Sequence, residues 1–327
     1  MDKKQRLYVI SIALIAIIAI STVGIFLYYQ GQIAPNEGTP IVTITDDTGY
    51  VLNMTAYPER IVSLAPSNTQ VLFAVGAGGK VVGVTDYDHY PYNFTAWIEA
   101  GNMTSIGNYY QPAVEPIVAL NPDLVLASLG SVETADQLRT LGYSVLTLIP
   151  TDLDGIMKNM LTVGKVTNHE AGATEAVDDM QQRIDTVVNG VKQAATRPKV
   201  YHEIWSDPYM SVGKGTFVDN AIRLAGGQNI FENATDSYPV VSSEAVIEQN
   251  PDIVVFPTQM GVESFWGDFE TVASRPGWSS INAVKNDKMF TVNGDIIDEP
   301  GPRQVDSLEI LAKIIHPEIF GNYTSTQ

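Results

Sequence analysis

The side chains that usually carry catalysis are sparse in this 327-residue chain. It contains no cysteine, no G-x-S-x-G pattern of serine hydrolases and no H-E-x-x-H pattern of zinc peptidases. The glycine-rich GAGGK at 76–80 lacks the spacing of a phosphate-binding loop and is typical of a helix end before a strand. Four histidines are present, at His89, His169, His202 and His316. No two of them have metal-ligand spacing, so we expect no catalytic residue, no resident metal and no cofactor.

Aromatic residues are concentrated in four segments that we expect to be loops. The segments read TDYDHYPYNF, NYYQP, EIWSDPYM and TDSYP, and each follows an expected strand or precedes an expected helix. Ligands of open α/β sheets bind beyond the carboxyl ends of the strands, where such loops gather. A single tyrosine in a loop is most often a half-buried anchor. As a group that recurs in both halves of the chain, these residues favour a cleft for a large flat or hydrophobic ligand.

Two phrases of the chain are nearly the same. EPIVALNPDLVL begins at Glu115, and EAVIEQNPDIVV begins at Glu244. Each has a Glu, then apolar residues, then Asn-Pro-Asp and a branched apolar run, which predicts a helix, a turn and a buried strand. The repetition predicts two similar lobes. Each Glu falls in the first turn of its expected helix, where a carboxylate complements the helix dipole.

Short apolar runs alternate with helical patterns in both halves. After an opening hairpin, IVTITDDTGYVLNM, the expected strands are RIVSLA, KVVGVT, LVLA and SVLTL, and later KVYHEIW, DIVVF and KMFTVN. The expected helices include SNTQVLFAVGAG, with Ser67 or Asn68 as its N-cap, TADQLRTLG and TFVDNAIRLAGG. Alternation of this kind predicts an α/β fold with parallel sheets that are covered on both faces.

A long helix is expected between the two halves. Apolar residues recur at steps of three and four from Asn168 to Ala195, and Pro198 ends the pattern. Such a helix is about 40 Å long and could connect two lobes with limited hinge motion. The expected organisation is a cytoplasmic tip at 1–6, a transmembrane anchor or signal at 7–29, a flexible linker at 30–40, an N-terminal lobe at 41–165, the connecting helix at 166–197 and a C-terminal lobe at 198–327.

The N-terminus predicts attachment to a membrane. Lys3, Lys4 and Arg6 precede an uncharged stretch from Leu7 to Tyr29, which as a helix would span about 35 Å. Its length and closing tyrosines favour an uncleaved anchor over a cleaved signal peptide. The positive residues keep the N-terminus in the cytoplasm, so we expect the main domain outside, in a periplasm or at the cell surface.

Charge and sequons agree with an external protein. The formal net charge of −18 repels a phosphate backbone, so nucleic acid is excluded as a partner. Asn-x-Ser/Thr triplets are compatible with a glycoprotein, and they begin at Asn53, Asn93, Asn102, Asn233 and Asn322.

Several long segments together resemble one family. They are TDDTGYVLNMTAYPERIVSLAPSNTQVLFAVGAGGKVVGVTDYDHYP, EPIVALNPDLVLA, VGKGTFVDNAIRLAGGQNIF and PGPRQVDSLEILAKIIHPEIF. In this order they resemble the substrate-binding proteins of ABC importers for ferric siderophores, haem and cobalamin, from about residue 41 to 320. The resemblance implies two Rossmann-like lobes joined by one long helix, with a ligand cleft between them. It also implies a partner, an ABC permease dimer with its ATPase subunits.

The resemblance implies a role for each repeated Glu. Each lobe of these proteins presents a surface Glu that pairs with arginines of one permease subunit, and Glu115 and Glu244 match those positions. The chain departs from the family at Gln70, where a Glu often follows Ser-x-Thr. We expect that change to affect local capping or the cleft but not the fold.

The resemblance also implies a set of ligand-binding residues. Similarity to cobalamin binders places Tyr109 and Tyr238 against the corrin, with Tyr87 and Trp205 as further lining. Arg303 lies in the Pro-x-Arg segment of the family near the cleft and could serve an anionic chelate.

The sequence therefore predicts a monomeric, membrane-tethered substrate-binding protein that captures a metal chelate and is not an enzyme. Cobalamin or another corrinoid is favoured because the expected cleft is aromatic and carries little positive charge, whereas anionic ferric siderophores call for several Arg or Lys. The alternatives are a ferric siderophore or haem bound in the same way. Further alternatives are a chelate-processing hydrolase and a surface adhesion module on the same scaffold.

Overall fold

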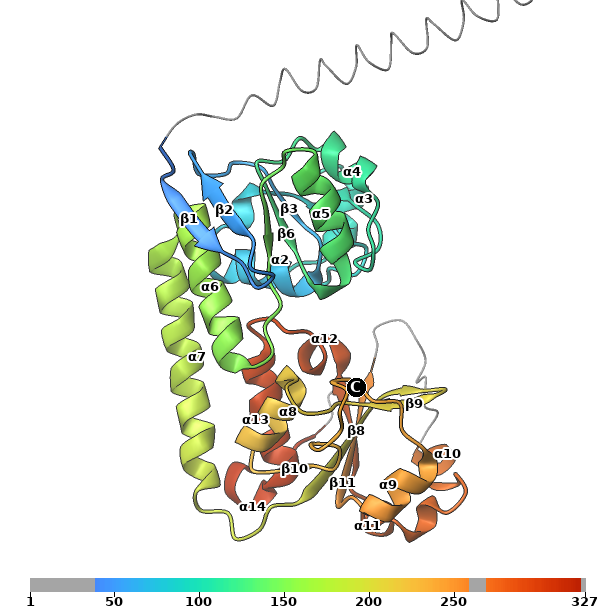
Figure 1. Cartoon of the computed structure of the whole chain (residues 1–327). Coiled ribbons are helices and arrows are strands. Elements are labelled where there is room, and N and C mark those ends of the chain that lie inside the picture. Colours follow the sequence, from blue (N-terminus) through green and yellow to red (C-terminus); the bar gives the residue numbers. More distant parts are fainter. Residues whose placement is uncertain (1–38, 259–268, 325–327) are drawn as a thin grey trace, which may run out of the picture. The chain divides into compact units, whose positions relative to one another are not determined.

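The structure, a computed structural model, describes residues 39–258 and 269–324 (Figure 1). It divides into two compact units, Met1–Ile41 and Val42–Gln327, and every element below belongs to the second. In the described ranges no helix is long and apolar enough to cross a bilayer. The tip at 1–6, the span at 7–29 and most of the linker at 30–40 lie outside these ranges.

The first lobe is built on a five-stranded parallel sheet with the order β5-β4-β3-β6-β7. The strands are β3 (Ile61–Ser63), β4 (Val81–Val84), β5 (Thr104–Ser105), β6 (Leu124–Ala127) and β7 (Val145–Thr147). The helical segments are α2 (Pro66–Ala74), η1 (Gly78–Lys80), α3 (Phe94–Glu99), α4 (Val114–Ala119), η2 (Leu129–Ser131) and α5 (Val132–Thr140). All residues of β3, β6 and β7 are buried, as in a sheet covered on both faces. The strands expected in this half are confirmed as β3, β4, β6 and β7.

The second lobe repeats the plan. Its parallel sheet has the order β10-β8-β11-β12, and β9 pairs antiparallel with β8. The strands are β8 (Lys199–Ser206), β9 (Tyr209–Ser211), β10 (Gln228–Asn229), β11 (Ile253–Thr258) and β12 (Met289–Asn293). The helical segments are α8 (Phe217–Leu224), α9 (Ser243–Gln249), α10 (Phe269–Ala273), η3 (Trp278–Ser280), α11 (Asn282–Lys285), α12 (Gly294–Ile297), α13 (Gln304–Ile315) and α14 (Pro317–Phe320). Parallel sheets in an α/β arrangement are therefore confirmed.

The expected opening hairpin is confirmed and is tied to the first sheet. Its strands β1 (Val42–Thr45) and β2 (Val51–Met54) are antiparallel. In the connecting turn, Asp46 accepts a hydrogen bond from Thr147 N (3.0 Å) and is ion-paired with Arg139. The neighbouring Asp47 accepts from Ile149 N (2.8 Å). The turn thus holds the start of the folded unit against the end of β7.

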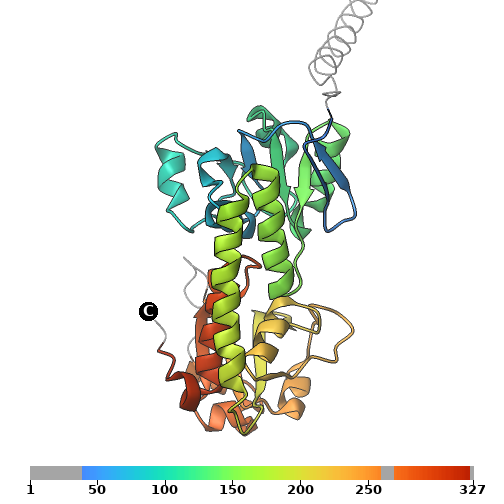
Figure 2. The ribbon, with the colours of Figure 1, turned by 90° about the vertical axis from the view of Figure 1, so that its left-hand side faces the viewer.

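Two adjacent helices, α6 (Leu153–Thr167) and α7 (Glu170–Val191), lie side by side (Figure 2). α7 continues along both lobes, whereas α6 lies beside the first lobe and contacts α8 of the second. α7 packs against α2 of the first lobe and against α8, α13 and α14 of the second. It ends earlier than the helix expected from Asn168 to Ala195, and it starts later because Asn168 takes a left-handed conformation (φ 61°) that ends α6. Helix α6 is not among the helices expected from the sequence.

Glycines allow α7 to approach its neighbours closely. A Cβ on Gly164 of α6 would lie 2.4 Å from the Cβ of Ala173, and a Cβ on Gly172 would lie 2.4 Å from the carbonyl oxygen of Val75. Neither distance is compatible with a side chain. The missing side chains therefore set the spacing between α7 and the first lobe.

The cap expected for α2 is wrong. The N-cap is Ala65, which makes no side-chain hydrogen bond, and Pro66 takes the first helical position. Proline fits there because its fixed φ suits the first turn and its missing N–H would have no helical partner. Asn68 instead donates its side-chain amide to Ala127 O (3.0 Å), which links α2 to β6.

The repeated phrases build the same junction in each lobe. Both asparagines of the Asn-Pro-Asp turns, Asn121 and Asn250, have left-handed φ angles of 48° and 47°. Asp123 then accepts from Arg60 N at the start of β3 (2.9 Å), and Asp252 accepts from Lys199 N at the start of β8 (2.9 Å). Each turn therefore reverses the chain and binds the first strand of its own sheet. The expected two lobes are confirmed.

The close packing of α7 generates a stability prediction. Gly172→Ala should lower the free energy of unfolding by about 1 to 3 kcal/mol, because the new methyl group must displace the backbone of Val75. Chemical denaturation of the full chain in detergent measures the change. Gly79→Ala is the control, since nothing lies within 4 Å of a Cβ there, and it should change stability by less than about 1 kcal/mol. Equal effects of the two substitutions would contradict the packing argument.

Candidate functional site

Two predicted aromatic residues of the first lobe lie in contact. The rings of Tyr87 and Tyr109 are 5.2 Å apart in an edge-to-face arrangement. They follow neighbouring strands, β4 and β5, at the carboxyl ends of the sheet. The two side chains are 48% and 43% exposed, so a pair of aromatic rings is available to a ligand at this edge. Edge-to-face geometry favours the pair by about 0.5 to 1.5 kcal/mol and keeps the rings in fixed orientations.

A buried acid shapes the loop that carries Tyr87. Asp88 is 1% exposed, and its Oδ2 accepts from both the backbone N (2.9 Å) and the hydroxyl (2.6 Å) of Thr85. The Thr85 hydroxyl in turn accepts from Tyr87 N (3.2 Å). These hydrogen bonds fix the backbone of the loop and thus the direction of the exposed Tyr87 ring. Burial raises the pKa of Asp88.

Of the predicted residues of the second lobe, Trp205 lies near the end of β8 and Tyr238 lies in the loop before α9. Trp205 is 38% exposed and donates its indole N–H to Asp207 O (2.9 Å). Tyr238 is 40% exposed, and partial desolvation together with the negative charge of Asp298 raises the pKa of its hydroxyl. Asp298 also bonds the buried His202 at Nε2 (2.8 Å).

An ion pair supports β8, which carries Trp205, and the neighbouring strand β9. Glu203 of β8 is fully buried and pairs bidentately with Arg275 at 2.8 and 2.9 Å. The guanidinium also lies over the rings of Tyr209 on β9 (4.8 Å) and Trp278 (4.5 Å). Burial and the Glu203 carboxylate raise the pKa of Tyr201 well above its usual value. The start of β9 is therefore held by Arg275, which is ion-paired with Glu203 and stacked on Tyr209.

The predicted Arg303 lies against a residue of the first lobe. Its guanidinium is 4.4 Å from the ring centre of Tyr90, and Asp306 lies 3.9 Å away. The side chain is only 17% exposed. Its guanidinium group therefore faces protein groups more than open solvent.

Acidic groups surround this contact between the lobes. Glu299 accepts a hydrogen bond from Nε2 of Gln70 (2.5 Å), a residue of α2 in the other lobe. Burial, together with the charges of Asp295 and Asp88, raises the pKa of Glu299 to about 9. The Glu299 side chain is therefore neutral at pH 7. Tyr90 belongs to the aromatic segment TDYDHYPYNF expected at the site, whereas Glu299 and Asp88 were not expected there, although DHY lies within the first segment of the resemblance and DEP adjoins the last.

Both repeated glutamates occupy the positions expected in their helices. Glu115 lies in the first turn of α4, and Glu244 lies in the first turn of α9. Both are exposed. Within the described ranges neither carboxylate takes part in an ion pair, so each is available to a partner.

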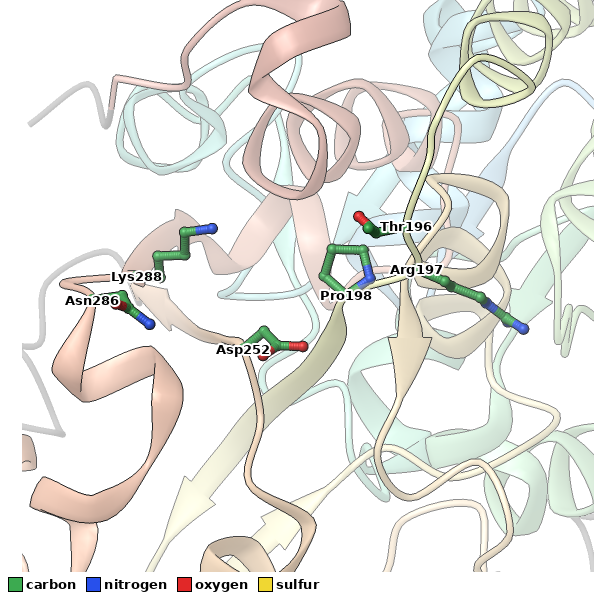
Figure 3. A pocket seen from close by; sticks show the side chains of 6 residues that line it. All are labelled: Thr196, Arg197, Pro198, Asp252, Asn286 and Lys288. Carbon is green, nitrogen blue, oxygen red and sulfur yellow. The ribbon is translucent and has the colours of Figure 1, made fainter.

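One pocket lies away from all predicted site residues (Figure 3). It has a volume of about 300 Å³ and is lined by Thr196, Arg197, Pro198, Asp252, Asn286 and Lys288. Arg197 points away from Lys288 and donates to Gly227 O (3.0 Å), and Asp252 bonds the start of β8. Its polar groups do not converge, so we assign it no ligand. In the described ranges no three His, Cys, Asp or Glu side chains are grouped to hold a metal ion.

Comparison with known proteins decides the family. A family model described as periplasmic binding protein matches residues 61–295. The chain belongs to this family. It is 32% identical to an ABC transporter substrate-binding lipoprotein of Bacillus subtilis over 85% of this chain and 87% of that protein. It is also 32% identical to a cobalamin-binding protein of Halobacterium salinarum, over 84% of this chain and 74% of that one.

Solved structures of the periplasmic binding protein family share the fold. The vitamin B12 binding protein of Vibrio cholerae has a TM-score of 0.67 at 25% identity and covers 79% of this chain and 96% of its own. The haem-binding protein of a Roseiflexus species has a TM-score of 0.70 at 25% identity, covering 79% and 98%. The two-lobed arrangement of parallel sheets is thus that of this family.

The buried Glu203–Arg275 pair generates a second prediction. Arg275→Met should lower the free energy of unfolding by about 3 to 5 kcal/mol, because it leaves the Glu203 carboxylate buried without a cation. Denaturant unfolding checks this. Arg223→Met, on the exposed side of α8, is the matched control and should cost less than about 0.5 kcal/mol. A loss below about 1 kcal/mol for Arg275→Met would mean that the pair acts as an ordinary surface ion pair.

Proposed function

We propose that this member of the periplasmic binding protein family is the extracytoplasmic substrate-binding protein of an ABC importer and that it carries a corrinoid such as cobalamin. Its relatives are binding proteins of transport systems rather than enzymes. The observation that carries the ligand proposal is the exposed Tyr87–Tyr109 pair at the carboxyl edge of the first sheet. Trp205 and Tyr238 would complete the aromatic lining from the second lobe.

The charges near the lobe contact support a ligand without net negative charge. Asp295 and Asp298 lie in this region, whereas the proposed ligand cation, Arg303, already contacts Tyr90 and Asp306. A corrinoid with an amide periphery needs hydrogen bonds and stacking surfaces. Haem, with its propionates, and most ferric siderophores need cationic partners. Haem or a ferric siderophore is therefore the second candidate ligand. A solved structure with the same fold is a haem-binding protein.

The proposed cellular arrangement follows from the N-terminal sequence and from the relatives. The B. subtilis relative is a lipoprotein, whereas this chain has no cysteine to carry a lipid. We infer that the apolar stretch at 7–29 takes over the attachment and that the folded unit works outside the membrane as a monomer. Glu115 and Glu244 would dock on the two halves of the permease.

The ligand proposal is tested by calorimetric titration of the full chain with cobalamin, haem and a panel of ferric siderophores. Cobalamin should bind, and Tyr87→Ala or Tyr109→Ala should each weaken it at least about tenfold, or about 1.4 kcal/mol. Tyr57→Ala removes a similarly exposed tyrosine outside the proposed site and should leave the affinity unchanged. Tight binding of a siderophore or haem, with no response to cobalamin, would replace the corrinoid by the second candidate.

The docking proposal is tested by reversing both charges, Glu115→Lys with Glu244→Lys. Ligand affinity should stay the same, while stimulation of the reconstituted permease ATPase should fall to the basal rate, because each lobe would present the wrong charge. The control reverses Glu133 and Glu248, which gives the same net charge from the first turn of α5 and the exposed side of α9. Full stimulation by the first double variant would exclude these two residues from docking.

A further inference from the structure

His202, in the sheet of the second lobe, is held by both of its ring nitrogens. The residue lies on β8 and is fully buried. Its Nδ1 lies 3.2 Å from the carbonyl oxygen of Val255 on the neighbouring strand β11, and its Nε2 lies 2.8 Å from Oδ1 of Asp298. The Ser211 hydroxyl donates to the His202 carbonyl oxygen (2.7 Å), so the backbone is fixed at this point as well.

These contacts determine how many protons the His202 ring carries. A carbonyl oxygen can only accept, so Nδ1 must carry a hydrogen to bond Val255 O. A second proton must lie between Nε2 and Asp298, because two acceptors 2.8 Å apart would repel each other. Imidazole is a stronger base than a carboxylate, so this proton belongs to the ring. The contacts therefore describe a buried imidazolium that is ion-paired with Asp298.

Asp298 lies where the second lobe meets the first. It directly follows α12, which in turn follows β12 at the carboxyl edge of the sheet. The next residue, Glu299, accepts a hydrogen bond from Gln70 of the first lobe. The Asp298 side chain is 31% exposed, although the ring that it binds is fully buried. One carboxylate oxygen is thus tied to His202, and the other is open to a ligand at this edge.

The buried ring sets both the charge and the direction of the Asp298 carboxylate. Among the described residues no Lys or Arg pairs with Asp298, and Arg303 of the same segment lies over Tyr90 instead. Turning the carboxylate away would leave Nε2–H of His202 buried without an acceptor, which costs free energy. His202 therefore keeps Asp298 ionised and in one orientation.

We propose that His202 is a positioning residue of the ligand site and that it holds Asp298 as an acceptor for amide N–H groups of the ligand. This role rests on the proposed function, because the peripheral amides of a corrinoid are N–H donors. A hydrogen bond to an ionised acceptor is shorter and stronger than one between neutral groups. An ionised carboxylate cannot donate, so the same oxygen disfavours the carboxylates of haem.

Nuclear magnetic resonance of the ligand-free full chain in detergent tests the protonation of His202. Selective ¹⁵N labelling reports on four histidines, and the signals that are lost in His202→Gln belong to His202. If that variant does not fold, His89→Gln, His169→Gln and His316→Gln assign the remaining signals by elimination. At about pH 7 both ring nitrogens of His202 should carry hydrogens, and Asp298→Asn should leave one of them unprotonated. A neutral His202 ring in the parent chain would overturn the proposal.

Calorimetric titration tests the acceptor role with two corrinoids that differ at the periphery. Dicyanocobinamide carries amides, whereas heptamethyl cobyrinate carries methyl esters and has no N–H donor there. The ratio of the two affinities should shift against the amide form by about fivefold or more in Asp298→Asn. His202→Leu should shift it equally, and the double variant no further, because both changes remove the same contact. Asp178→Asn, on the exposed side of α7, is the control and should leave the ratio unchanged.

The outcomes distinguish the acceptor role from the proposed function. If dicyanocobinamide binds the parent chain and Asp298→Asn leaves the ratio unchanged, the acceptor role is wrong while the corrinoid function stands. Additive shifts in the double variant would show that His202 does not act through Asp298. If neither corrinoid binds the parent chain, the corrinoid function and the acceptor role fail together, and the spectrum still decides whether the His202 ring is charged.

Discussion

The close approach of α7 to the first lobe is the constraint on which the arrangement of the molecule depends. Gly164 and Gly172 leave no room for side chains between α7, α6 and the end of α2, while the other side of α7 packs on α8, α13 and α14. Contacts on both lobes fix which edges of the two sheets face each other. The same contacts position the loops after β4 and β5 and the end of β8, which carry the aromatic residues of the proposed lining.

Much of the fold could be predicted because parallel strands buried on both faces are continuous apolar runs, as in LVLA and DIVVF. Helix α6 escaped prediction although Ile156, Met160 and Val163 keep helical spacing. Gly155 and Gly164 lower its intrinsic helix propensity, and the reason for Gly164 lies in its contact with Ala173, which is tertiary. The cap of α2 was misassigned for a similar reason, because Asn68 bonds β6 rather than its own helix.

The candidate site was predictable in its residue types but not in its contacts. Exposed tyrosines after strands can be recognised in a sequence, and Tyr87 and Tyr109 do meet. The stacking of Arg303 on Tyr90 joins residues from different lobes, and no local pattern encodes it. The neutral state of Glu299 depends equally on burial between the lobes. These long-range contacts alter the expected chemistry, since the one predicted ligand cation is partly engaged and its surroundings are acidic.

The central claim is that loops of both lobes contact one corrinoid. Hydrogen exchange of the full chain with and without hydroxocobalamin tests it most directly, because exchange reports each segment separately. We predict slower exchange in the loops around Tyr87 and Tyr109 and, in the same sample, around Trp205 and Tyr238, with no change near Arg197 and Lys288. Protection confined to one lobe, or centred on the pocket between Arg197 and Lys288, would contradict the account.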